Sequence, residues 1–485
     1  VEALPAPAGE GWEGFDLARS VLYELHIGTF TPGGTFASAI ERLDYLGELG
    51  VDAVEVMPIN QFSGRHGWGY DGVGLFAPHH AYGGPDGFRE FVAACHRRGL
   101  GVVLDVVYNH LGPVGNYLGH FGPYFTDMYQ TPWGDAVNLD GPGSDEVRRF
   151  FIDNALMWLG SYGVDGLRLD AVHALIDRSA VHFLEELSGE VDALEEELGR
   201  KLWLIAESDL NDPRLLWSRD RGGYGLDAAW SDDFHHSLHA LLTGERDGYY
   251  QDYGTVGDLA KALRSVYVYD GRFSPTRGRR HGRPVGDLGG ERFVAYLQNH
   301  DQVGNRARGR RIGHLVEESR LYAGAALVLT APFVPMLFQG EEWAASSPFP
   351  YFSDHRDPDL AEAVRQGRRE EFSDFGWDPD RIPDPQDLAT FRSAVLDWDE
   401  TSRPGHGSVL EWYRLLIGLR RSSPDLSAGA GDDLHVEADD DNATLVVTRG
   451  RTVVAVNFAS ERRRIGLPGH WADVGPGSVA ILELL

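Results

Sequence analysis

The stretch GVVLDVVYNH, residues 101–110, consists mostly of apolar, β-branched residues. Its few polar residues lie toward the C-terminal end of the stretch. Three further segments close apolar runs in the same way: GLRLDAVH at 166–173, LIAES at 204–208 and QNHD at 298–301. A buried parallel strand that delivers side chains to a site would have this composition, because strands covered on both faces are almost continuously apolar. The segments therefore predict parallel strands whose C-terminal ends carry acids and imidazoles.

Strands and helices are predicted to alternate along the chain. Stretches with helical period, among them residues 36–50, 86–99, 144–163 and 316–329, separate short apolar runs, which indicates repeated βα units. The candidate strands are residues 21–27, 53–59, 101–108, 166–172, 203–208, 228–230, 293–299 and 334–340. Eight units of this kind predict an α/β fold, a (β/α)8 TIM barrel.

A doubly wound parallel sheet stays open as an alternative, because the sixth candidate strand is only the three residues 228–230. Against it, no GxGxxG turn or GxxxxGK[ST] loop follows the first strand. A nucleotide-binding fold would then lack the glycine-rich backbone that cradles phosphate.

Two composition changes divide the chain. Residues 1–426 are predicted to form the barrel, with an irregular excursion at about 111–143 and a polar, proline-rich insertion at about 344–407. From residue 427 to 485, alternating strands separated by Asp, Asn and Gly turns predict a small antiparallel, β-sandwich-like domain. Long loops after barrel strands are where active sites are built.

Charge and cysteine usage exclude several classes of partner. The 485 residues carry 44 basic and 74 acidic side chains, a formal charge of −30, which disfavours nucleic acid or an anionic membrane as partner. Cys95, the single cysteine, is predicted to be a core residue because no second thiol exists for a disulfide or metal site. No apolar run is long enough to span a bilayer, so we expect a cytoplasmic protein, with processing left open because residue 1 is Val.

The candidate functional residues are predicted to converge, because every strand of a barrel opens onto the same face. They are Asp105, His110, Arg168, Asp170, His173, Glu207, His300 and Asp301. Acids and imidazoles ringed by aromatic residues favour acid/base chemistry on an uncharged, oxygen-rich substrate. A two-metal hydrolase centre is the alternative, but HxH and HExxH spacings are absent and Arg168 would lie beside the cation. Asp105 could also be a structural partner of Arg168.

These motifs resemble the conserved regions of the α-amylase family of glycoside hydrolases, and the resemblance extends from Val21 to the C-terminal β-domain. It implies a (β/α)8 barrel, a retaining mechanism and an α-glucan substrate. By position, Asp170 matches the nucleophile and Glu207 the general acid/base. Asp301 matches the third carboxylate, which stabilises the transition state.

Further positions match groups that hold the sugar at the cleaved bond. Tyr70 in GWGYDG matches an aromatic platform, and His110, Arg168 and His300 match residues that bind hydroxyls or orient the nucleophile. The physical chemistry agrees, since Arg168, two residues before Asp170 on the same strand face, would favour the ionised nucleophile. Burial and neighbouring acids would keep Glu207 protonated.

Within that family, residues 231–254, 298–311 and 337–355 resemble the maltooligosyltrehalose trehalohydrolases, which cut the α-1,4 bond next to a terminal trehalose. The resemblance implies maltooligosyltrehalose, an α-glucan oligosaccharide, as substrate. In the family pattern His173 projects toward the leaving-group side, and Glu341 and Phe349 are candidates for additional walls there. Members usually carry a β-sandwich before the barrel, so this chain is either a fragment or lacks that domain.

Two alternatives remain at this point, a branching enzyme or other transferase of the family, and an inactive relative that only binds. Branching enzymes typically show SHDE where this chain has NHDQ at 299–302, and no carboxylate of the set is missing. Many relatives bind calcium near the position of Asn109. The loop after His110 offers only Asp127 and Asp135, too few for a hard cation, so no metal or other cofactor is expected. The oligomeric state is not predicted.

Overall fold

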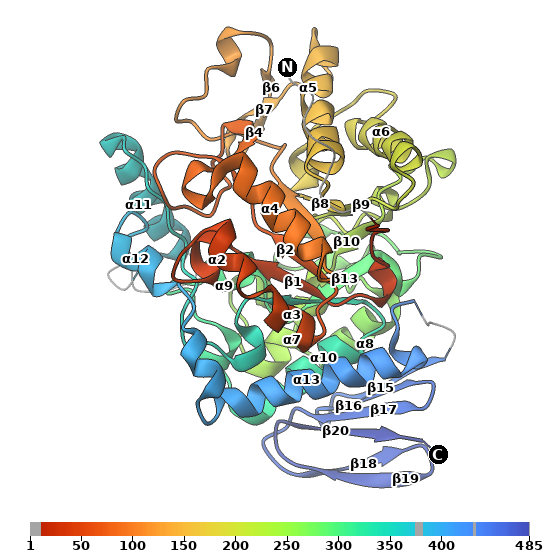
Figure 1. Ribbon diagram of the computed structural model, residues 1–485. Helices are drawn as coiled ribbons and strands as arrows, with labels where there is room; N and C mark the ends of the chain where they lie inside the picture. Colours follow the sequence, from red (N-terminus) through yellow and green to blue (C-terminus); the bar gives the residue numbers. More distant parts are fainter. Residues whose placement is uncertain (1–10, 374–381, 430–432, 485) are drawn as a thin grey trace.

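The computed structural model describes residues 11–373, 382–429 and 433–484 and contains a closed barrel of eight parallel strands (Figure 1). The strands are β1 (Leu22–Leu25), β2 (Ala53–Val56), β5 (Gly101–Val106), β8 (Gly166–Leu169), β9 (Trp203–Ala206), β10 (Ala228–Trp230), β13 (Phe293–Tyr296) and β14 (Val334–Phe338). All eight candidate strands are confirmed. The doubly wound alternative is wrong, because β1 pairs with both β2 and β14 and so closes the sheet.

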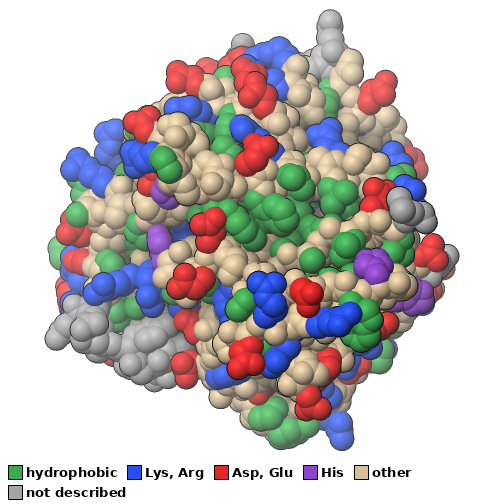
Figure 2. Space-filling view, turned by 90° about the horizontal axis from the view of Figure 1, so that it is seen from below, with side chains coloured by type: hydrophobic (Ala, Val, Ile, Leu, Met, Phe, Trp, Pro, Cys, Tyr) green, Lys and Arg blue, Asp and Glu red, His purple; other side chains and the backbone are tan. Residues whose placement is uncertain are grey.

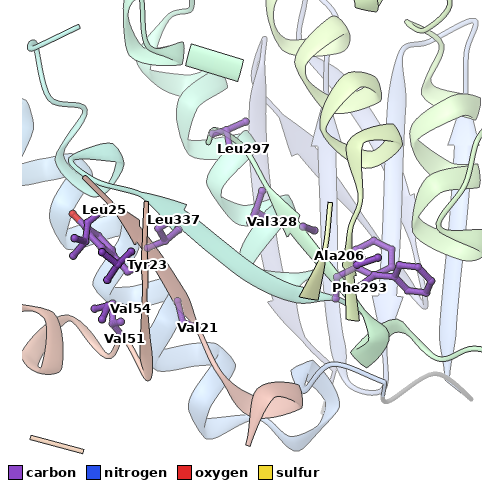
Figure 3. Close-up of a cluster of buried hydrophobic side chains, with 14 of the residues drawn as sticks. Val21, Tyr23, Leu25, Val51, Val54, Ala206, Phe293, Leu297, Val328 and Leu337 are labelled. Atoms are coloured by element: carbon purple, nitrogen blue, oxygen red, sulfur yellow. The ribbon is translucent and has the colours of Figure 1, made fainter. Parts of the chain in front are cut away.

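Side chains alternate between two apolar environments along each barrel strand. Tyr23, Val54 and Leu337 point outward into the layer between strands and helices, where Figure 3 shows Val328 of α10 among the strand side chains. Leu22 and Ala53 point into the barrel and pack with residues of the other strands. Because the period of a strand is two residues, the next inward positions lie one layer closer to the C-terminal ends. Those positions include Glu24, Glu55, Asp105 and Arg168, so a polar layer covers an apolar floor.

The described helices either cover the outside of the barrel or lie in the loops that follow its strands. They are α1 (Ile27–Phe30), α2 (Phe36–Ile40), α3 (Leu43–Leu49), α4 (Gly84–His96), α5 (Ser144–Leu156), α6 (Phe183–Leu198), α7 (Asp232–Thr243), α8 (Val256–Ser265), α9 (His300–Gly304), α10 (Glu318–Thr330), α11 (Pro358–Ser373), α12 (Leu388–Ser393) and α13 (His406–Ser422). The helix predicted at 36–50 is broken into α2 and α3, and Cys95 is buried on α4 as predicted. Between β9 and β10, all of which is described, the chain forms two short 3-10 turns, Pro213–Leu215 and Arg219–Arg221, in place of an α-helix.

None of the helices in the described ranges is both long and apolar enough to cross a membrane.

Both loop insertions are more ordered than the sequence indicated. The excursion at 111–143 was expected to be irregular, but it contains the antiparallel hairpin β6 (Phe125–Thr131) and β7 (Gly134–Val137). The insertion at 344–407 contains α11 and α12, while residues 374–381 lie outside the described ranges. A further hairpin, β3 (Asn60–Gln61) with β4 (Gly74–Pro78), flanks Tyr70. These segments all emerge after barrel strands and therefore surround the same end of the barrel.

The C-terminal strands form two antiparallel sheets. Strands β15 (Leu434–Asp439), β16 (Thr444–Arg449), β17 (Thr452–Asn457) and β20 (Ser478–Glu483) make one sheet, and β18 (Arg463–Leu467) pairs with β19 (His470–Val474). The second pair was not predicted. Seen from the side of these strands, acidic and basic side chains are interspersed around a central band of apolar ones (Figure 2). The predicted boundary at residue 427 falls just after a turn at Pro424–Leu426, and the division into domains stays a prediction.

Candidate active site

A cavity of about 540 Å³ opens at the C-terminal ends of the barrel strands. The predicted residues that line it are Tyr70, His110, Asp170, His173, Glu207, His300 and Asp301. Arg168 and Asp105 lie directly beneath, each no more than 1% exposed, and contact the lining residues from below. The fold thus brings together nine of the predicted positions, which come from several βα units.

The ends of the strands position the three carboxylates. Asp170 directly follows β8, and the chain then turns at Ala171, which has the left-handed φ of 40°. Glu207 directly follows β9. Asp301 lies in the first turn of α9, whose N-terminus is capped by the Asn299 side chain accepting a hydrogen bond from the Gln302 N–H. Each acid therefore leaves a rigid element just where the barrel opens.

Arg168 organises the charges of the site. Its Nη1 donates to Asp105 Oδ2 at 2.7 Å and to Asp170 Oδ1 at 2.9 Å, and its Nη2 lies 3.6 Å from Glu207 Oε2. The other Asp170 oxygen accepts from Asn109 Nδ2 at 2.8 Å. Donors therefore meet both oxygens of Asp170, which favours its ionised form. Sequence reasoning considered Asn109 only as a position near a calcium site and missed this contact.

Glu207 is in the opposite electrostatic environment. Burial raises its pKa to about 8, and the negative charges of Asp170, Asp232 and Asp301 act in the same direction, against the opposing effect of Arg168. Its Oε2 accepts a 2.5 Å hydrogen bond from the Ala171 N–H. At neutral pH Glu207 is therefore mostly a neutral acid, next to an ionised Asp170. Two carboxyl groups on one guanidinium thus hold different charge states.

Tyr70 and His300 form the base of the cavity beside these acids. Their rings stack with centroids 5.1 Å apart, and His300 Nε2 lies 2.7 Å from the Tyr70 hydroxyl. That hydroxyl donates to Asp105 Oδ2 at 2.5 Å. Below His300, Glu24 approaches its Nδ1 to 2.5 Å. Sequence reasoning missed Glu24, although a single acid in an otherwise apolar strand was a signal that could have identified it.

The walls of the cavity come from the loops. Trp133 of the hairpin stacks on His110 with centroids 4.6 Å apart, and His173 is exposed at the rim. On the other side, Leu360 and Val364 of α11 line the cavity. Sequence reasoning missed α11, although Asp357 before Pro358 is a recognisable helix start, and its carboxylate accepts from the N–H groups of residues 359 and 360. Other lining residues that it did not assign include Trp68, Asp71, Asn305, His355 and Arg368.

Two predicted wall residues do not reach the cavity. Glu341 is 1% exposed and accepts hydrogen bonds from the Tyr413 hydroxyl and from Gln298 Nε2. Phe349 is fully buried and stacks on Trp68 with centroids 5.3 Å apart. Both follow the eighth strand, as predicted, but the loop turns them into the packing beneath the site. Phe349 therefore acts on the cavity only through Trp68.

The candidate calcium ligands do not form a cation site. Asp127 and Asp135 are exposed on the hairpin, and Asn109 directs its amide nitrogen at Asp170. Among the described residues, no group of three or more His, Cys, Asp or Glu side chains is placed to hold a metal ion. The residues present therefore do not fit calcium at this position.

A (β/α)8 barrel whose strand ends hold an ionised and a neutral carboxyl group on one arginine, with a third acid nearby, defines a glycoside hydrolase of the α-amylase class. The model of the alpha amylase catalytic domain matches residues 9–121 of the chain. The malto-oligosyltrehalose trehalohydrolase of Arthrobacter ramosus is 55% identical over 462 residues, which cover 95% of this chain and 79% of that protein. The chain belongs to this trehalohydrolase family.

Two further comparisons agree with this assignment. The crystal structure of an alpha-amylase candidate from Salmonella typhimurium superposes with a TM-score of 0.89 at 39% identity, covering 97% of this chain and 82% of the other. The 1,4-alpha-glucan branching enzyme GlgB of Pseudoalteromonas atlantica is 32% identical over 283 residues, 52% of this chain and 38% of that enzyme. The similarity to the branching enzyme is thus weaker and covers a smaller share of the chain.

Proposed function

We propose that this chain hydrolyses the α-1,4 bond next to the terminal trehalose of malto-oligosyltrehalose and releases trehalose, with retention of configuration. Two observations support the proposal. The chain is 55% identical over 95% of its length to a malto-oligosyltrehalose trehalohydrolase. Its cavity holds a carboxylate and a neutral carboxyl group on the same arginine, as a retaining glycosidase requires. The contrast between Asp170 and Glu207 carries the mechanism.

In the first step, an Asp170 oxygen attacks C1 of the sugar at the cleaved bond. The bond between C1 and the leaving oxygen breaks, and Glu207 gives its proton to that oxygen, so trehalose leaves as a neutral alcohol. Arg168, which donates to Asp170 Oδ1, holds the attacking carboxylate in place. Asp301, whose side chain is 38% exposed, faces the cavity and stabilises positive charge as it develops on the sugar.

In the second step, Glu207 is a carboxylate and acts as general base. It takes a proton from water while the water oxygen attacks C1, and the ester bond to Asp170 breaks. The maltooligosaccharide leaves as its α-anomer, and both carboxyl groups return to their starting charge states. Asn109 and Arg168 bind the Asp170 oxygens again as its charge is restored.

The leaving disaccharide must be recognised by shape and by its hydroxyl groups, because trehalose has no reducing end. His173 lies three residues after Asp170 at the rim of the cavity, and we assign it to the leaving-group side. Trp133, 48% exposed and stacked on His110, offers the cavity a flat apolar surface of the kind that sugars contact. Selectivity for trehalose would then depend on the excursion after β5 and the turn after β8.

The test is an incubation with maltotriosyltrehalose, with maltopentaose as a control of equal length that lacks the trehalose end. We expect trehalose and maltotriose from the first substrate and slower cleavage of the second. Early NMR spectra should show maltotriose as the α-anomer. A change in the iodine stain of amylose without new reducing ends would assign a branching enzyme instead. Absence of turnover on all three glucans would assign an inactive relative.

A further inference from the structure

Two buried glutamates occupy matching positions in neighbouring barrel strands. Glu24 is the third residue of β1 and Glu55 the third residue of β2, and the two are paired in the parallel register. Each is 1% exposed. Burying an ionised carboxylate is costly unless hydrogen bonds or opposite charges compensate. The surroundings of each carboxyl group therefore determine its charge.

The carboxyl group of Glu24 receives two hydrogen bonds from a single residue. Its Oε2 accepts from the His300 backbone N–H at 2.9 Å, and its Oε1 lies 2.5 Å from His300 Nδ1. Two donors on its two oxygens favour the carboxylate form of Glu24. The Nδ1 atom of His300 must then carry a hydrogen, because a carboxylate can only accept.

The opposite side of the His300 ring leads to the same conclusion for its other nitrogen. The Tyr70 hydroxyl has one hydrogen and donates it to Asp105 Oδ2, which also accepts from Arg168. Toward His300 Nε2, 2.7 Å away, that hydroxyl can therefore only accept. His300 Nε2 must also carry a hydrogen. The ring is then an imidazolium that donates at both ends.

Glu55 is different. Neither of its oxygens has a hydrogen-bond partner among the described residues. Burial, with the negative charges of Glu24 and Asp105 in addition, raises its pKa far above the ordinary value, against the effect of Arg168. Glu55 is therefore a neutral acid at physiological pH, one strand away from an ionised Glu24.

We propose that Glu24 is a positioning residue that keeps His300 doubly protonated, so that the imidazolium and the Tyr70 hydroxyl to which it donates stay fixed beside the sugar at the cleaved bond over the whole neutral pH range. Glu24 does not reach the cavity and acts only through His300, which does line it. The proposal concerns the site of the proposed function and rests on it, but the protonation of His300 can also be measured without substrate.

The charges that face His300 agree with this assignment. Although burial acts to lower it, the pKa of His300 is raised to about 9 by Asp301 and Glu24, with Arg168 opposing. Asp301 Oδ2 lies 3.5 Å from Nε2. Of the other titratable neighbours, Glu55 is neutral, and burial lowers the pKa of His26 to about 4, so it carries no charge. The rings of Trp68 and Trp230 complete the surroundings.

The test compares Glu24→Gln with Glu55→Gln, two isosteric changes at paired positions of the barrel. In Glu24→Gln one of the two anions that hold the imidazolium is gone, so the pKa of His300 should fall toward its ordinary value of about 6.5, although Asp301 still acts against burial. Relative to wild type, kcat/KM on maltotriosyltrehalose should then fall toward about one tenth at pH 7.5 and recover toward unity as the pH is lowered below about 6. Glu55→Gln replaces a neutral acid with a neutral amide and should leave the pH profile unchanged.

A loss in Glu24→Gln that is equal at all pH values would overturn the proposal, because it would indicate a purely structural role. The same holds if Glu55→Gln reproduces the pH shift. If Glu24→Gln does not fold, the protonation state of His300 in the wild-type protein tests the proposal instead. In ¹⁵N-histidine NMR spectra at pH 7.5, with the His300 signals assigned by their loss in His300→Asn, both ring nitrogens should be protonated. A neutral His300 ring in those spectra would overturn the proposal whatever the substrate proves to be.

Discussion

Replacing Glu207 with Gln tests the division of roles between the two carboxyl groups on Arg168. The amide keeps the shape of the protonated acid but cannot give up a proton, so protonation of the leaving oxygen is lost. On maltotriosyltrehalose we expect kcat/KM to fall by about 10²- to 10⁴-fold, the range for losing a general acid. On α-maltotriosyl fluoride, whose leaving group needs no proton, release of fluoride should stay within about tenfold of wild type.

The pH profile of the wild-type enzyme follows from the same group. Burial raises the pKa of Glu207 to about 8, so the acid is mostly protonated at pH 7 and mostly ionised at pH 9. The sign is that of a general acid: activity is present below the pKa and is lost as the pH rises through it. The alkaline limb of kcat/KM on maltotriosyltrehalose should therefore lie near pH 8. It should be absent with the fluoride, where only the titration of His300 near pH 9 remains.

Measurement of kcat/KM isolates the first chemical step, since the second step, in which Glu207 acts as base, does not affect it. Two results would refute this reasoning. Equal losses on the fluoride and on the natural substrate would show that Glu207 is not the acid. An alkaline limb below about pH 6 in the wild type would show that Glu207 ionises near its ordinary value of about 4.3.

Four further substitutions test other parts of the molecule. Asp170→Asn should reduce turnover by at least about 10⁴-fold with an unchanged circular dichroism spectrum, because it removes the group that bonds to the sugar, and substantial remaining activity would contradict the assignment. His173→Ala should lower the ratio of kcat/KM for maltotriosyltrehalose to kcat/KM for maltopentaose. Phe349→Ala should leave that ratio unchanged but lower the free energy of unfolding by about 3–5 kcal/mol, because Phe349 is buried against Trp68. Arg449→Met should lower the denaturant midpoint by an amount equivalent to about 2–5 kcal/mol without changing activity. The reason is that the Arg449 guanidinium donates hydrogen bonds to the backbone carbonyls of Thr330, Ala331, Leu426 and Ser427. An unchanged midpoint would show that these hydrogen bonds do not contribute to stability.

The sequence alone was sufficient to predict the barrel and the convergence of Asp170, Glu207 and Asp301 at one end of it. Buried parallel strands must be apolar on both faces, so an acid such as Asp170 or Glu207 at the end of such a run stands out without any structure. Strand length did not limit this prediction, since even β10, three residues long, pairs on both sides. The antiparallel strands of the C-terminal sheet were likewise predictable from their alternating pattern.

The structure of the loops was harder to predict from the sequence. The excursion after β5 folds into a hairpin and the insertion after β14 supplies α11, and both line the cavity although neither the hairpin nor the helix was predicted. Glu341 and Phe349 were placed in the cavity because they follow a barrel strand, yet the loop turns them into the packing below. Position along the chain indicates which end of the barrel a residue reaches, but not the direction in which its side chain points.

Glu24 and Glu55 show that the sequence pattern predicts the burial of an acid but not its charge, which depends on the tertiary structure. Each is one acid in an otherwise apolar strand, YEL in one case and VEV in the other, so local pattern assigns them the same role. The sequence determined that both are buried, because the strands around them are. Only the folded barrel decided that Glu24 meets two donors from His300 while Glu55 meets none within the described ranges, because a buried carboxyl group takes its charge from partners that are remote in the chain.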